Sequence, residues 1–193
     1  MVIVRKRVAG LSEIALARFV TRAGRAARLH GAVNVLLTSN SELRALNSRF
    51  RGKDKPTDVL SFPPVFGLGN AFAGDVAISA EMASHNARLL GHSPAEEVKI
   101  LTLHAMLHLA GYDHERDDGE MAHTEERLRK SLGLPIGLIH RNQLKPNGAG
   151  RKARLTVIMR QPKAVGRSKS QSASSHKFAM AKAAGNGRAT QVR

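Results

Sequence analysis

Three histidines lie close together in the chain at a spacing that suits a metal site. His104 and His108 are four residues apart, so a helix would place both imidazoles on one face. Gly111 can end that helix in the left-handed conformation, and the returning chain can bring His114 to the same point. Three imidazole nitrogens with an open fourth position are typical of catalytic zinc, whereas structural zinc usually has four protein ligands. The segment therefore predicts a catalytic metal centre.

The residue after the first histidine separates two classes of metal enzyme. The H-x-x-x-H-x-x-G-x-x-H spacing matches the zinc site of the metzincin peptidases, which carry a glutamate directly after the first histidine as general base. This chain has Ala105 there, and alanine cannot accept a proton. Asp113 is the nearby candidate to accept a hydrogen bond from a ligand imidazole. His123 is expected to be an ordinary helix histidine rather than a fourth ligand.

A second group of candidate residues lies in the segment Arg49-Phe50-Arg51-Gly52-Lys53-Asp54-Lys55, at a predicted helix-to-strand junction. By itself such a cluster is more often a solvated turn. Beside a metal it can bind phosphate, because Arg grips phosphate oxygens with two donors and Lys supplies a mobile charge.

The positive charge is concentrated toward one end of the chain. Of 31 Lys and Arg residues, 12 lie in residues 145–193, which contain no Asp or Glu; residues 1–144 hold the other 19 and all 15 acidic residues. The Ser-, Ala- and Gly-rich composition of this part predicts a disordered basic tail over 141–193, following a domain over 1–140. Such a tail attracts polyanions without reading their sequence.

Composition narrows the cellular context. No apolar run reaches the roughly 18 residues that span a bilayer, and the first residues lack the apolar core of a signal peptide. The chain has no cysteine, which excludes disulfides and thiolate ligands. These features favour a cytoplasmic protein that does not act at a membrane.

Hydrophobic periodicity and capping residues predict an α+β fold with a single small mixed β-sheet packed with helices. The metal site would lie on a central buried helix and the turn after it. Ser39 and Ser93 are helix-start signals, each with Glu three residues on. The predicted strands cover 2–4, 32–37, 57–62 and 75–78, and the predicted helices cover 12–29, 40–49, 80–90, 94–110 and 118–132.

Three motifs in this order closely resemble those of the YbeY family. They are Phe50-Arg51-Gly52-Lys53-Asp54-Lys55-Pro56-Thr57-Asp58-Val59-Leu60-Ser61-Phe62-Pro63, Gly74-Asp75-Val76-Ala77-Ile78-Ser79, and the histidine segment from His104 to His114. The resemblance covers roughly residues 1–135. Ala105 stands where the family usually has Gly, and Phe50 where Tyr is frequent.

The resemblance implies a single-strand-specific, metal-dependent endoribonuclease that matures the 3′ end of 16S rRNA and acts in ribosome quality control. It implies that His104, His108 and His114 bind one Zn²⁺ and that Arg51 is needed for cleavage. Lys53 and Lys55 are the candidate substrate-binding residues beside it. Expected partners are ribosomal RNA and the small ribosomal subunit, with ribosomal proteins and a ribosome-assembly GTPase as further candidates, and no DNA.

Two alternatives from other classes stay open at this point. A metalloprotease shares the histidine spacing, although Ala105 argues against it. A non-catalytic ribosome-associated factor could use the same metal structurally and bind rRNA through its tail. Turnover of RNA separates the enzyme from the binding factor.

Overall fold

A four-stranded sheet with helices on both sides forms the described part of the chain, which comprises residues 1–64, 71–114 and 116–135 of a computed structural model. The strand order is β1-β2-β4-β3; β1, β2 and β4 are parallel, and β3 is antiparallel to β4. The elements are β1 (Val2–Val4), α1 (Glu13–Ala26), β2 (Ala32–Thr38), α2 (Asn40–Arg51), β3 (Val59–Phe62), β4 (Phe72–Ser79), α3 (Ala80–Leu90), α4 (Pro94–Leu109) and α5 (Glu120–Leu132). The predicted α+β fold with one small mixed sheet is confirmed, whereas the predicted tail over 141–193 lies outside the described residues.

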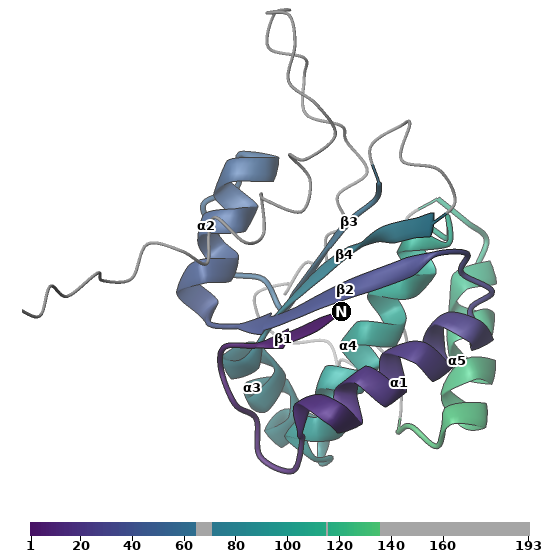
Figure 1. Cartoon of the computed structure of the whole chain (residues 1–193), viewed down its shortest axis with the longest axis horizontal. Coiled ribbons are helices and arrows are strands. Elements are labelled where there is room, and N and C mark those ends of the chain that lie inside the picture. Colours follow the sequence, from purple (N-terminus) through teal and green to yellow (C-terminus); the bar gives the residue numbers. More distant parts are fainter. Residues whose placement is uncertain (65–70, 115, 136–193) are drawn as a thin grey trace, which may run out of the picture. The chain divides into compact units, whose positions relative to one another are not determined.

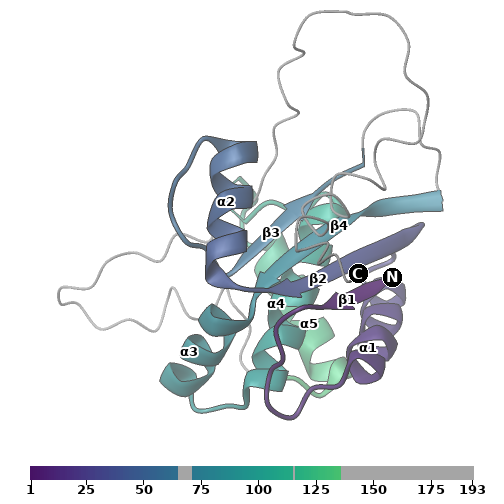
Figure 2. The same cartoon turned by 60° about the vertical axis from the view of Figure 1, so that its left-hand side comes forward.

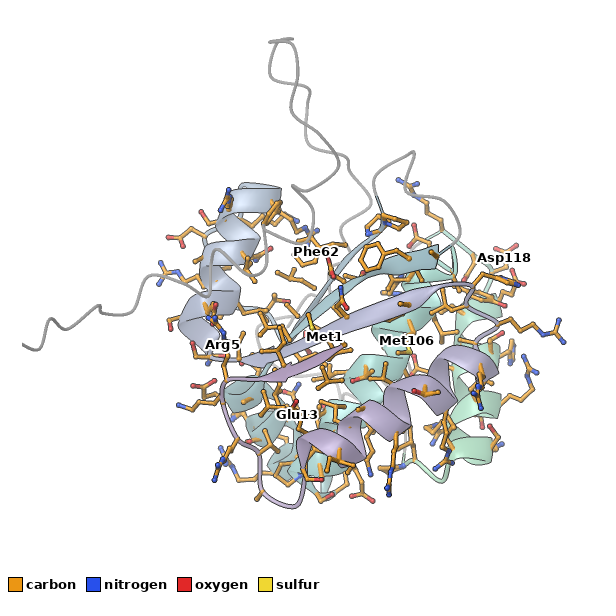
Figure 3. All side chains as sticks on the ribbon, viewed as in Figure 1. Met1, Arg5, Glu13, Phe62, Met106 and Asp118 are labelled. Carbon is orange, nitrogen blue, oxygen red and sulfur yellow. The ribbon has the colours of Figure 1, made fainter. Side chains whose placement is uncertain are left out.

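The sheet separates two hydrophobic layers. Helices α1, α4 and α5 lie on one side of it, and α2 lies on the other (Figures 1 and 2). Because side chains alternate across a strand, Val35 and Leu37 of β2 join the main core, whereas the buried Leu36 between them is not part of that cluster. Met106 of α4 belongs to the main core and lies beneath the sheet in Figure 3.

Helix α4 is the central element of the larger layer. Ser93 and Glu96 form a capping box at its start: Ser93 Oγ accepts from Glu96 N, and the Glu96 carboxylate accepts from Ser93 N. Its residues from Ile100 to His108 are all buried, as a helix covered on every side requires. Although α4 is strongly apolar, no helix of the described residues is long and apolar enough to cross a membrane.

Several predicted element boundaries differ from the structure, and three of the differences have local reasons. Helix α1 ends at Ala26 rather than 29, because Arg28 adopts a positive φ of 54°. Strand β3 begins at Val59 rather than 57, and the Asp58 side chain accepts a hydrogen bond from the Val59 backbone. Strand β4 begins at Phe72 rather than 75, so Phe72 and Gly74, expected to precede the strand, pair with β2.

Gly74 lets the end of α4 approach the sheet closely. Its φ is +139°, and a Cβ at this position would lie 2.6 Å from the Phe62 carbonyl oxygen and 2.7 Å from Leu109 Cδ2. Any other residue would collide with backbone on one side and a side chain on the other. The absence of a side chain at Gly74 thus allows β3, β4 and the last turn of α4 to meet at one place.

Candidate metal centre

The three predicted ligand histidines converge at the end of α4. His104 and His108 lie on consecutive turns of the helix and are buried, and half-buried His114 returns from the turn that follows. Each offers one ring nitrogen, and these three atoms lie within 4.8 Å of one another. Gly111 has the predicted left-handed conformation, with φ of +96°. The reversal of the chain at this glycine brings His114 back over the helix.

Hydrogen bonds fix the orientation of two of the imidazoles. His104 Nδ1 lies 2.9 Å from Oε2 of Glu125, which is buried on α5, and His108 Nδ1 lies 2.8 Å from the Tyr112 carbonyl oxygen. A carboxylate and a carbonyl can only accept, so both Nδ1 atoms carry the proton. In the neutral rings, Nε2 of each histidine therefore presents its lone pair to the centre of the triad.

The electrostatics of this arrangement favour a cation. Nε2 of His104 and Nε2 of His108 are only 3.0 Å apart, so two lone pairs face each other at close range. A proton between them would charge one ring, but burial, then the neighbouring His104 and His114, lowers the pKa of His108 from 6.5 to about 2. Neutral imidazoles with converging lone pairs are the form that binds a metal ion.

The donor set limits which ions fit. Three imidazole nitrogens suit zinc and other late first-row transition metals, whereas calcium and magnesium prefer oxygen ligands. An acceptor for the second ring nitrogen of a ligand histidine is also typical of protein metal sites, and His104 and His108 both have one. The residues present therefore fit a transition-metal ion held by three histidines.

The predicted phosphate-binding residues lie on another element. Arg51 is the last residue of α2, and Gly52 ends that helix with φ of 66°. Lys53 and Lys55 follow in an exposed loop. The Asn47 side chain donates to the Lys55 carbonyl oxygen at 2.8 Å and holds this loop against α2. Arg44 on α2 also binds the loop residue Asp54 through two hydrogen bonds, from Nε to Oδ1 and from Nη2 to Oδ2, each 2.6 Å long.

A series of contacts links this basic segment to the metal helix. Phe50, the residue before Arg51, packs edge-on against Phe62 at the end of β3, with ring centroids 5.2 Å apart. The Phe62 carbonyl and the Leu109 side chain both border Gly74, and Leu109 directly follows His108. Strand β3 thus lies between α2 on one side and α4 on the other, with Arg51 and the histidines at the same end of the strand.

Sequence reasoning missed Glu125 as a partner of the ligand histidines. It lies 21 residues after His104 on a different helix, so no local spacing connects the two. Its only signal in the sequence was a carboxylate on the apolar face of the last helix, next to the buried Leu128. His123 is exposed on the same helix, as expected of an ordinary helix histidine. Ala105 is buried in the main core, where its methyl group is accommodated.

Comparisons with known proteins relate most of this chain to one family. The family model described as Endoribonuclease YbeY matches residues 4–133. A relative from Koribacter versatilis, named Endoribonuclease YbeY, is 56% identical over 141 residues, which are 73% of this chain and 91% of the relative. A relative of the same name from Solibacter usitatus is 46% identical over 139 residues, 72% of this chain and 92% of that one. The chain therefore belongs to the YbeY endoribonuclease family.

Proposed function

We propose that this protein is a zinc-dependent endoribonuclease that cleaves single-stranded RNA, matures the 3′ end of 16S rRNA and acts in ribosome quality control. The convergence of three histidine nitrogens, two of them fixed by Glu125 and the Tyr112 carbonyl, is the observation that carries the proposal. The relatives' name, Endoribonuclease YbeY, supports RNA as the substrate.

The residues divide the work between metal binding and charge stabilisation. His104, His108 and His114 would hold one Zn²⁺, which when bound acts as a Lewis acid on a phosphate oxygen. Cleavage of a phosphodiester gathers negative charge on its non-bridging oxygens, and Arg51 would stabilise that charge with directed N–H donors. Lys53 and Lys55, both exposed, would bind neighbouring phosphates of the substrate.

The proposed setting is the cytoplasm, on or near the small ribosomal subunit. Ribosomal RNA is a large polyanion, and the chain carries a formal net charge of +16. Ribosomal proteins and a ribosome-assembly GTPase are the proposed protein partners. The basic segment 145–193 would add affinity for rRNA that weakens with salt.

Metal analysis combined with RNA cleavage tests the proposal. The purified full chain should contain close to one zinc per molecule and cleave a single-stranded rRNA fragment. Chelation should abolish cleavage, and added zinc should restore it. Tight RNA binding without turnover, in every divalent metal tested, would instead identify a non-catalytic ribosome-associated factor. Metal-dependent release of peptides from casein would favour the metalloprotease, which Ala105 argues against because alanine cannot act as a base.

Removing the carboxylate behind His104 should weaken metal binding. Glu125→Ala takes away the acceptor for His104 Nδ1, and we expect the affinity for zinc to fall roughly 10–100-fold. Glu125→Gln keeps an acceptor oxygen without the charge. Its affinity for zinc should lie between that of the unmodified protein and that of Glu125→Ala. Competition with a chromogenic chelator measures the affinity directly. Glu126→Ala is the matched control, because Glu126 pairs with Lys130 at the surface; an equal loss in that variant would contradict a specific role for Glu125.

A further inference from the structure

A concave basic surface lies away from the histidines, where α1, the start of α4 and the end of α5 meet. It encloses a cavity of about 320 Å³. Arg18 and Arg22 of α1 and Lys99 of α4 bring three positive charges to it. Its apolar lining includes Phe19 and Leu134. The surface therefore combines cations with an apolar floor, and the proposed cleavage chemistry uses none of these residues.

The cations of this surface are available to a ligand. Arg18 and Arg22 are exposed and lie one helical turn apart, and the exposed Arg25 continues the same face. Within residues 1–64, 71–114 and 116–135, neither these three arginines nor Lys99 has a carboxylate within ion-pair distance. Glu96, the one acidic residue of the lining, has its carboxylate engaged by Ser93 at the helix cap. Glu96 offsets part of the Lys99 charge, so the positive excess of this surface comes mainly from its arginines.

The arrangement suits a chain of phosphates better than a single small anion. The arginines repeat along successive turns of α1, about 6 Å of rise from Arg18 to Arg22, and extend beyond the cavity to Arg25. A polymer with regularly spaced negative charges can contact all of these arginines, whereas a single phosphate can contact only one or two of them. The half-buried Leu132 and Leu134 of the lining can meanwhile contact riboses.

This surface lies along the same two helices as the metal site. Lys99 precedes His104 by five residues, about 7.5 Å of rise along α4. Helix α5 supplies Glu125 to the metal site and ends at Leu132, which also lines the cavity. Five residues also turn α4 by about 140°, so Lys99 and His104 face different sides of the helix, and an RNA strand that reaches both sites would pass around the protein surface between them.

We propose that the surface formed by Arg18, Arg22, Arg25 and Lys99, here called the α1 basic surface, binds phosphates of an RNA segment that flanks the segment at the metal. This inference rests on the proposed function, since it assumes that the substrate is RNA. The α1 basic surface makes long RNA a tighter ligand than short RNA.

A triple substitution in the full chain tests the inference. The variant combines Arg18→Gln, Arg22→Gln and Lys99→Gln. It should bind a long single-stranded RNA about tenfold more weakly at physiological salt, since three phosphate contacts are lost. The slope of log K against log salt should become shallower by about 2, at roughly 0.7 per contact. Binding and cleavage of a short RNA oligonucleotide that occupies only the metal site should stay unchanged.

A second triple variant controls for net charge. It removes an equal number of positive charges, three, from exposed positions elsewhere on the protein by the substitutions Arg7→Gln, Arg88→Gln and Arg127→Gln. An equal loss of affinity for long RNA in both variants, or no loss in the first, would overturn the proposal that the α1 basic surface binds RNA. So would unchanged RNA binding combined with lost binding to phosphatidylglycerol vesicles, which would assign the surface to lipid. Failure of the unmodified protein to cleave either RNA would refute the proposed function instead, because the binding comparison does not depend on cleavage.

Discussion

His114→Ala protein is expected to fold normally and to lose both its metal and its RNA cleavage. His114 supplies one of the three ring nitrogens that converge in the described part of the chain, and two histidines would leave the ion with half of a tetrahedral set. Loss of a hydrogen-bond partner of a ligand histidine typically lowers metal affinity roughly 10–100-fold, and we expect the loss of the ligand itself to lower the affinity for zinc by more. Cleavage should fall to the background of the assay. Metal content per chain and cleavage of a single-stranded rRNA fragment measure the two losses.

The fold should survive this change because of where His114 lies. It is half-buried in a turn and belongs to no helix or strand, so its truncation should cost about 1 kcal/mol of unfolding free energy. Circular dichroism and urea unfolding check this. His123→Ala, which removes an exposed histidine from α5, is the matched control and should keep full metal and activity. Undiminished cleavage by metal-free His114→Ala protein would refute the proposed mechanism.

Arg51→Ala is expected to reduce cleavage by about 10²–10³-fold while the metal stays bound, the loss typical of one donor to a transition state. Arg51 ends α2 and is not among the converging histidine ligands, so zinc content should remain that of the unmodified protein. The loss should appear mainly in kcat, because the charge it stabilises develops during the reaction. Steady-state kinetics on a short single-stranded RNA provide the measurement.

Two further variants distinguish a directed role of Arg51 from general charge. Arg51→Lys keeps the charge but loses the planar pair of donors, and we expect it to recover only part of the activity. Arg49→Ala removes a neighbouring guanidinium that lies 5.5 Å from the Phe50 ring centroid, and it should change kcat little. A rise in KM with unchanged kcat in Arg51→Ala would assign this residue to substrate binding rather than to the chemical step.

Local signals in the sequence predicted most of the elements. Ser39 and Ser93 each accept a hydrogen bond from the glutamate three residues later, so both predicted helix starts are confirmed. Gly111 has the positive φ that its position after a helix suggested. These features depend on residues within one or two turns of each other, and the sequence displays such relations directly.

Long-range relations could not be predicted in the same way. Nothing in the spacing of the strands shows that β4 pairs between β2 and β3, since that order depends on how the helices pack across the sheet. The contact of Phe50 with Phe62 and the hydrogen bond of His104 with Glu125 likewise join separate elements. The metal ligands themselves were accessible to sequence reasoning because all three lie within one helix and the following turn.

The compactness of the ligand segment has a consequence for folding thermodynamics. His104 to His114 span eleven consecutive residues, so the denatured ensemble retains all three imidazoles on one short piece of chain. Zinc stabilises the native state only to the extent that it binds that state more tightly than the denatured one. Glu125 is absent from the short segment, and the orientation of His108 by the Tyr112 carbonyl requires the folded turn. The rise in unfolding temperature on adding zinc therefore depends more on the extra affinity that these two acceptors give the native state than on the total affinity for the metal.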